Sequence, residues 1–329
     1  MAIQSNEIKR YKATVNNDTT SNGGRMSTAL ITSDVKNAVF PNVSEDERTS
    51  GTTRWRKVFV KIANDDDLTL HNTRIHYTNI TGADDYVMFC EGTQTDIYSD
   101  LSSLTMYGTG VLESNVNAGD STITVTVEDA SMDIFNTASA TNVIWIGDDT
   151  NEEYFENVAA SLSGTTYTLT LDTGDTLANS YTTTATYVGS CLDKGDVEAS
   201  FDTVVVTSTA GTFDSTTHPI VLDNIGTVYD EWTIEFVTTT TYSITGANEG
   251  LLASGGNISS DASPTNNDFA KKYMTIPSAA FGGSFEVGDT ITFKTYPAAI
   301  PIWHKETIPA GSASYSNNTW TEKIIGESA

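Results

Sequence analysis

The sequence predicts a mainly β protein, in which a discontinuous β-sandwich or barrel-like main domain carries a smaller inserted all-β domain. Short runs of alternating apolar and polar residues recur along the chain, and most end in Gly, Asp or Asn. Threonine repeats in TSTAGTF, FVTTTTY and YTTTATY favour pleated strands, because a β-branched side chain loses rotamer freedom in a helix. Helical periodicity is scarce throughout.

Residues 1–112 form the first part of the predicted main domain. A polar turn region, TVNNDTTSNGGRMS, precedes the strand WRKVFVKIAN, in which Val58, Val60 and Ile62 share one face. The next alternating run is DDDLTLHNTRIHYTNI. The short connection NDDD between the two runs predicts a hairpin.

Residues 113–192 differ in sequence pattern from the preceding segment and form the predicted inserted domain. Four short strand-like runs lie close together and are separated by turn residues, as is typical of a small sandwich or barrel. They are NAGDSTITVTVED, NVIWIGDD, TTYTLTLDTGD and TTTATYVGS. We expect the acidic GDDTNEE segment to form a hairpin tip.

Residues 193–329 form the second part of the main domain. EWTIEFV and TYSITG alternate well, and the Thr run between them predicts a hairpin turn. A long polar stretch follows from Gly246 to Asp268, and a loop of this length is either functional, held by a neighbour or mobile.

The segment from Gly288 to Ala313 begins as a half-buried strand and continues into an apolar stretch interrupted by prolines. Each proline removes a backbone donor, so the stretch is expected to run as an extended arm or edge strand rather than a central one. Trp and Tyr are frequent at interface hot spots, which favours cover by a neighbouring subunit. The interface candidates in this arm are Tyr296, Pro297, Ile300, Pro301, Ile302 and Trp303.

A second candidate interface is the Arg54-Trp55-Arg56 sequence. In a strand, Trp55 faces away from both arginines, so a buried indole places the two guanidinium groups outward, where they can bind carboxylates. A core tryptophan flanked by ordinary surface arginines explains the pattern equally well.

Segments at both ends of the chain resemble a virion structural protein of Mu-like and other contractile-tailed phages and their prophages. They are AVFPNVSEDERTSGTTRWRKVFVKIAN, KKYMTIPSAAFGGSFEVGD, the Gly288 to Ala313 segment and SNNTWTEKIIGESA. The resemblance implies a component of the head-tail neck or collar, present in the virion and assembled in the host cytoplasm. Because these segments flank residues 113–192, the middle region is interpreted as an insertion.

The net charge of -26 argues against direct binding to nucleic acid, which requires Lys and Arg to displace counterions. The basic residues gather before His76, which indicates that the amino-terminal part docks on an acidic partner or another subunit; an ordinary mixed surface is the alternative. No apolar run has the length of a signal peptide core or a membrane span, so we expect no membrane contact.

No catalytic, cofactor-binding or metal-binding motif is present, and we expect no enzyme activity and no cofactor. A small metal site near His71, His76 and the preceding aspartates is conceivable, but a solvated turn is the favoured interpretation. Cys90 and Cys191 are expected to be free buried thiols, although pairing between them stays open.

We therefore expect a structural protein that forms an oligomeric collar from copies of itself and contacts head-tail connector or tail proteins. A baseplate component or a capsid decoration is an alternative of the same class. The acidic middle domain also allows a carbohydrate-binding adhesion module, with Trp145, Tyr154, Tyr167 and Tyr187 as sugar-stacking candidates. A depolymerising hydrolase is the least favoured alternative, because no long β-helix repeat is visible.

Overall fold

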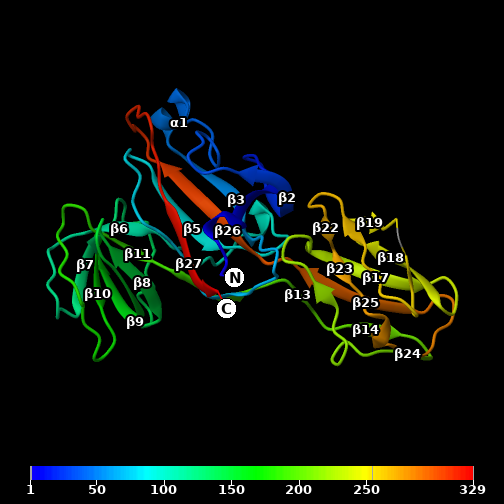
Figure 1. The fold of residues 1–329 in the computed structure, drawn as a ribbon. Coiled ribbons are helices and arrows are strands. Elements are labelled where there is room, and N and C mark those ends of the chain that lie inside the picture. Colours follow the sequence, from blue (N-terminus) through cyan, green and yellow to red (C-terminus); the bar gives the residue numbers. More distant parts are fainter. Residues whose placement is uncertain (1, 254, 329) are drawn as a thin grey trace.

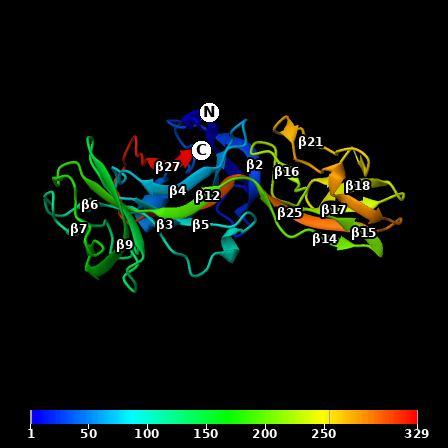
Figure 2. The ribbon, with the colours of Figure 1, turned by 60° about the horizontal axis from the view of Figure 1, so that its bottom comes forward.

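The computed structural model describes residues 2–253 and 255–328 and confirms a mainly β fold. Three modules lie in a row in this part of the chain (Figures 1 and 2). A central sandwich separates a closed barrel from a distal module, and each has its own hydrophobic core. The short helices are η1 (Ser5–Glu7), α1 (Glu45–Ser50), η2 (Tyr98–Asp100) and η3 (Ser278–Ala280).

The central module packs two antiparallel sheets face to face. The larger sheet has the order β2-β1-β3-β26-β5, with strands β1 (Ile8–Val15), β2 (Gly23–Ile31), β3 (Thr52–Ile62), β5 (Tyr86–Glu91) and β26 (Ala299–Ile308). The smaller sheet has the order β12-β4-β27, with strands β4 (Leu70–Tyr77), β12 (Leu192–Val197) and β27 (Glu322–Ser328). Val60, Ile62, Ile300 and Ile302 of the larger sheet pack against Ile75 of the smaller sheet in the core between them.

The hairpin predicted at NDDD is wrong, because β3 and β4 belong to different sheets of the sandwich. The turn between them crosses from one sheet to the other instead of folding back beside β3. Asn64 stabilises this crossing, since its Oδ1 accepts hydrogen bonds from the backbone N–H groups of Asp66 and Leu68, both at 3.0 Å. Asp67 supplies the left-handed conformation that the turn requires, with φ of 52°.

The barrel closes in the strand order β10-β7-β6-β11-β8-β9. Its strands are β6 (Thr109–Leu112), β7 (Thr122–Thr126), β8 (Asn142–Gly147), β9 (Glu152–Ser163), β10 (Thr166–Thr170) and β11 (Tyr187–Ser190). Ile123, Val125 and Val127 alternate into its core, as the sequence pattern predicts. The acidic segment forms the hairpin tip between β8 and β9, where Asp148 N–H donates to Asn151 O at 3.0 Å.

The distal module is built around β17 (Asp230–Phe236), β18 (Thr241–Gly246) and β25 (Thr290–Tyr296). The predicted Thr-turn hairpin joins β17 to β18, and Ile291, Phe293 and Thr295 of β25 are buried as their alternation predicts. Shorter strands extend this sheet: β13 (Ser200–Phe201), β14 (Val205–Thr207), β19 (Gly250–Leu251) and β20 (Gly256–Asn257). Three two-stranded pairs complete the module: β15 (Ala210–Phe213) with β24 (Phe281–Ser284), β16 (Val221–Leu222) with β23 (Met274–Thr275), and β21 (Thr265–Asn266) with β22 (Lys271–Lys272).

Candidate functional site

The predicted carboxy-terminal arm is a central strand. β26 lies between β3 and β5, with ten residues in register with β3. Ile300 and Ile302 enter the sandwich core, and Trp303 lies on the opposite face of the sheet with none of its surface exposed. The prediction of an arm covered by another subunit is therefore wrong for these residues, because their own chain encloses them.

Pro301 is tolerated in β26 because of its position along the ladder. The carbonyl of Pro301 accepts from Gly92 N–H at 2.9 Å, and Gly92 is the residue after β5. In an antiparallel strand the N–H and C=O of a residue point to the same neighbour, so the missing donor of Pro301 faces the end of β5. The register with β5 starts one residue later, at Ile302, so the missing N–H of Pro301 lies outside the paired part of the two strands.

Tyr296 and Pro297 form part of the connection from the distal module to the central one. Tyr296 ends β25 and lies half-buried with its ring 5.5 Å from that of Tyr229. Pro297 is buried, and Ala298 O accepts from Ile62 N–H at 2.8 Å. The proline therefore fixes a covered connection between modules rather than a free arm.

Trp303 belongs to a buried polar cluster on the outer face of the larger sheet. Its indole N–H donates to Asp96 Oδ2 at 2.8 Å, and Lys57 Nζ lies 2.6 Å from Asp96 Oδ1. The Lys57 ammonium also donates to the carbonyls of Gly24 and Asp96. Burial lowers the pKa of Lys57, and Asp96 opposes that effect. Asp96 is thus the counterion of the fully buried Lys57.

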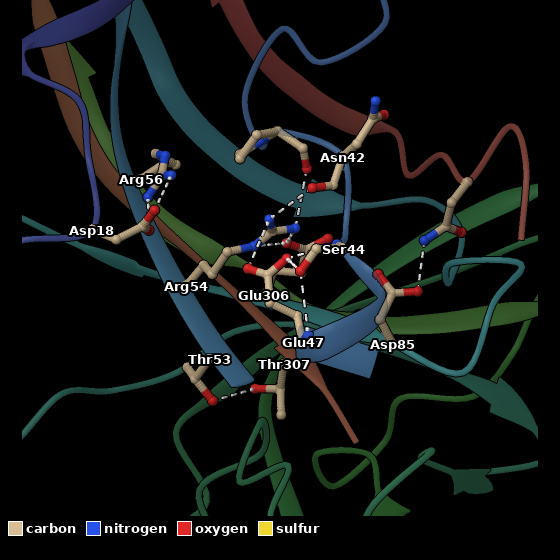
Figure 3. Close-up of polar contacts among 12 residues, drawn as sticks. Asp18, Asn42, Ser44, Glu47, Thr53, Arg54, Arg56, Asp85, Glu306 and Thr307 are labelled. Atoms are coloured by element: carbon tan, nitrogen blue, oxygen red, sulfur yellow. Dashed lines mark hydrogen bonds and ion pairs between the residues drawn. The ribbon is translucent and has the colours of Figure 1, made fainter. Parts of the chain in front are cut away.

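Arg54 and Arg56 point into the sandwich, the reverse of the predicted orientation (Figure 3). Arg54 Nη2 donates to Glu306 Oε2 at 2.5 Å and to Pro41 O at 3.1 Å. Arg56 Nη1 donates to Asp18 Oδ1 at 2.6 Å. The other side of β3 carries Trp55, which is half-buried beside Tyr98.

The reversed orientation has a physical cause at the apex of the sandwich, near α1. The inner face of the larger sheet changes there from aliphatic to charged, and the Phe40 ring lies 5.8 Å from the guanidinium groups of both Arg54 and Arg56. Loops that cover this end provide carbonyl and carboxylate acceptors, so the arginines are buried with their charges satisfied. The role of Arg54 and Arg56 in binding another subunit is not supported by this arrangement.

Three carboxylates surround Arg54. Glu306 Oε2 lies 2.5 Å from Arg54 Nη2, and Glu47 Oε1 lies 3.5 Å from Arg54 Nη1. Asp85 lies next to these residues, and its Oδ1 accepts from Asn318 Nδ2 at 2.6 Å (Figure 3). Asp85 Oδ2 has no hydrogen-bond partner among residues 2–253 and 255–328. Burial raises the pKa of Glu306 to about 7 against the opposing effect of Arg54, and burial also raises the pKa of Asp85. Burial therefore favours the protonated form of Glu306.

The junction between the central and distal modules is polar and tightly connected. Lys61 has none of its surface exposed, donates to Ile225 O at 2.6 Å and lies 4.4 Å from the centre of the Phe269 ring. Burial lowers its pKa to about 7. Around it, Arg25 pairs with Glu249 and Lys271 pairs with Asp65. These contacts join β2, β3 and the turn after β3 to the distal module.

The junction between the central module and the barrel shares a hydrophobic core. Tyr86 and Met88 of β5 are members of the barrel core. At the neighbouring edge Arg74 pairs with Glu156, and Lys323 pairs with Glu152 at 2.5 Å. His76 is buried between the smaller sheet and the barrel, with its ring 4.8 Å from that of Trp145, and burial lowers its pKa to about 4.

Most of the amino-terminal basic residues have partners within the chain. Ion pairs hold Arg10, Arg25, Arg54, Arg56, Lys57 and Arg74, and Lys61 donates to backbone carbonyls. The predicted docking of this basic cluster on an acidic partner therefore loses most of its charges. Clustering in sequence cannot distinguish a solvated cation from a buried one, and docking of this part on a partner stays a prediction.

The remaining chemical candidates are separated in space. His71 pairs with Asp196 at 2.9 Å, whereas His76 is buried at the barrel junction. No group of three potential metal ligands occurs in the described part of the chain. Cys90 and Cys191 are buried free thiols. A hollow of about 600 Å3 lies beside β5 and is lined in part by Glu91, Asp96 and Asp100.

The barrel aromatics do not form a sugar-stacking surface. Trp145 and Tyr167 are buried, and the Tyr167 hydroxyl donates to Met132 O at 2.9 Å inside the barrel. Tyr154 and Tyr187 are half-buried. No helix in residues 2–253 and 255–328 has the length and apolar character needed to cross a membrane.

Comparisons with known proteins identify no relative of this chain. No family model, no curated protein and no solved structure matches it.

Proposed function

We propose that this chain is a non-enzymatic structural protein of a contractile-tailed phage virion, forming an oligomeric collar around the head-tail neck. The resemblance of both chain ends to such proteins motivates the location in the particle. The structural observation that carries the proposal is the construction of an elongated body from three β modules whose junctions are rigidly connected.

The two junctions are built to hold the modules in fixed positions. The barrel and β5 share one core, so the barrel cannot rotate without exposing Met88 and Tyr86. The distal junction encloses Lys61, whose Nζ donates to Ile225 O, and moving the module would leave this buried donor without its acceptor. A body of this kind suits a component that spans a fixed distance between neighbours in an assembly.

The charge distribution is consistent with a component exposed on a particle. Between residues 109 and 190 the chain has no Lys or Arg and carries many carboxylates, including that of Asp149 at the exposed hairpin tip. Like charge keeps such surfaces apart from one another and from nucleic acid. Under this proposal the barrel projects outward, and the chain makes no direct contact with DNA or a membrane.

Immunogold labelling of intact particles tests the proposal. Antibodies raised against the purified chain should label the head-tail junction of virions from a host that carries the gene. Labelling of the baseplate or the capsid surface would favour those alternative positions in the particle. Absence of the chain from purified virions would refute the structural role.

Two of the four aromatic residues that motivate the glycan-binding alternative are buried, Trp145 against His76 of the central module and Tyr167 inside the barrel. A glycan array with the intact protein gives a direct comparison. Binding there would restore that alternative on some other surface.

A further inference from the structure

The last strand, β27, leaves one edge of the smaller central sheet open. Within residues 2–253 and 255–328 it pairs with β4 and with no other strand. An edge strand presents a row of backbone N–H and C=O groups that can pair with another chain. β27 runs along the face of the central module, near the amino-terminal segment (Figure 1).

The open edge of β27 is regular along its length. The register with β4 shifts between Ile325 and Glu327, which pair with Arg74 and His71. Two steps along β27 therefore correspond to three along β4, so the extra residue of this bulge belongs to β4. Asn72, with φ of 50°, lies at that bulge. The bulge does not interrupt the outer edge.

The side chains of β27 alternate between the two faces of the sheet. Ile324 packs on the sandwich core, and Glu322 accepts from Arg10 Nε at 2.8 Å. Lys323, Ile325 and Glu327 therefore share the opposite face. Ile325 is half-buried and Glu327 is exposed.

This pattern is complementary to itself in an antiparallel pair. When two copies of β27 pair about Ile325, each Lys323 lies opposite Glu327 of the second copy, and the two isoleucines face each other. A two-fold axis through Ile325 repeats the same Lys–Glu pair on both sides, as an isologous interface requires.

We infer that β27 is a self-association edge, at which two copies of this chain pair antiparallel and join their small sheets. The partner is a second copy because the order Lys-x-Ile-x-Glu places opposite charges across from each other when a second β27 runs antiparallel to the first. Lys323 already pairs with Glu152, but both side chains are partly exposed, at 37% and 41%, so sharing the lysine with a second carboxylate costs little.

This inference goes beyond the proposed function, since self-association does not depend on a location in the virion. One strand pair buries less area than a stable dimer usually needs, so the free protein should dimerise weakly. Simultaneous contacts in a larger assembly would strengthen the pairing. Because a two-fold contact closes on itself, a collar built with it would have the dimer as its unit.

Sedimentation velocity over a range of protein concentrations tests the inference with charge variants. Lys323→Glu alone and Glu327→Lys alone each create two like-charged pairs across the axis, and each should weaken dimerisation by about tenfold or more. The double variant Lys323→Glu/Glu327→Lys should restore it. An equimolar mixture of the two single variants should form a heterodimer, because their changed charges are complementary.

Lys294→Glu is the matched control, since Lys294 also forms a partly exposed ion pair, with Glu231, on a strand of the distal module. It should leave dimerisation unchanged. A wild-type protein that stays monomeric at several hundred micromolar would overturn the inference. The same conclusion follows if the two single variants dimerise as well as the Lys294→Glu control.

Oxidative cross-linking gives a second readout that does not depend on charge. With Ile325→Cys, the two-fold pairing brings the introduced thiols opposite each other at a distance suited to a disulfide. Covalent dimer should form much faster than with Val287→Cys, an exposed position in the distal module. Equal rates for the two variants would contradict pairing at β27.

Discussion

At the scale of single residues, buried charge is the most distinctive property of this chain. Arg54, Lys57 and Lys61 are all buried on β3, and each is satisfied by a different set of acceptors. Alternation along β3 correctly separates Arg54 and Arg56 from Trp55, but it cannot identify which face is the inner one. Their acceptors lie far away in sequence, for example Asp96 in a loop and Glu306 in β26, so local patterns in the sequence do not reveal them.

The raised pKa of Glu306 predicts a pH dependence of stability. Its folded-state pKa of about 7 exceeds the ordinary value of 4.5, so folding favours the protonated form. This contribution is fully present below pH 4.5 and is lost as the pH rises through 7. Between pH 5 and 8 the wild-type protein should lose on the order of 2 kcal/mol that Glu306→Gln does not lose.

Urea denaturation at a series of pH values measures this difference in the free energy of unfolding. Glu235→Gln, at an exposed position on β17, is the control and should retain the wild-type slope. Parallel pH profiles for the wild type and Glu306→Gln would show that Glu306 is ionised throughout this range.

Asp96 is predicted to be essential for the cluster around Trp303. Asp96→Ala removes the carboxylate that pairs with Lys57 and accepts from the indole, and leaves a buried ammonium without its counterion. The expected cost is about 3–5 kcal/mol in the free energy of unfolding. Glu235→Ala should cost less than about 0.5 kcal/mol, because Glu235 is at an exposed position. A similar small effect for Asp96→Ala would mean that Lys57 is stable without its charge partner.

At the scale of elements, local alternation and turn chemistry predicted strands well and their neighbours poorly. The hairpin of β17 and β18 and the core face of β7 follow from short-range patterns. The central position of β26 does not follow from such patterns, because the energetic cost of placing Pro301 in a strand depends on where the neighbouring β5 ends. The connection after β3 likewise depends on the sandwich: a short acidic turn can reverse a strand beside its neighbour or carry it to a second sheet.

The central position of β26 predicts a large effect for a core substitution. Ile302→Ala removes a fully buried side chain from between the two sheets and should destabilise the protein by about 2–5 kcal/mol. Val205→Ala, at a position 53% exposed in the distal module, should change stability by less than about 0.5 kcal/mol. Urea midpoints followed by tryptophan fluorescence provide the comparison. An Ile302→Ala midpoint equal to that of Val205→Ala would argue against β26 as the centre of the sandwich.

At the scale of the whole molecule, the chain forms three modules, whereas its sequence pattern predicts a main domain and one inserted domain. A separate core forms around Trp232, Ile234 and Ile291, which the sequence analysis did not distinguish from the sandwich. Its strands have the same alternation and turn residues as the others, so no local signal marks the boundary. Charge segregation was visible in the sequence, whereas the pairing of the basic residues within the chain depends on the fold.

The shared core between the barrel and β5 gives a prediction for the molecule as a whole. The barrel begins and ends at one point, since Ser190 N–H donates to Gly108 O at 3.0 Å, so residues 109–190 can be replaced by a short glycine linker. A self-contained insertion could be removed without exposing a core. Here, however, Tyr86 and Met88 pack into the barrel, and its removal should expose both side chains to water.

The deletion variant should therefore keep the β-sheet circular dichroism of the other modules but bind a hydrophobic dye and self-associate. Adding Tyr86→Thr and Met88→Thr to the deletion should reduce the dye binding, because these two side chains supply the exposed apolar surface. If the deletion variant binds no more dye than the intact protein, the barrel is an independent unit attached to the sandwich only by its connections. Strong dye binding that the two threonine substitutions abolish would instead show that barrel and sandwich fold around a common core, which is the rigidity that the proposed structural role requires.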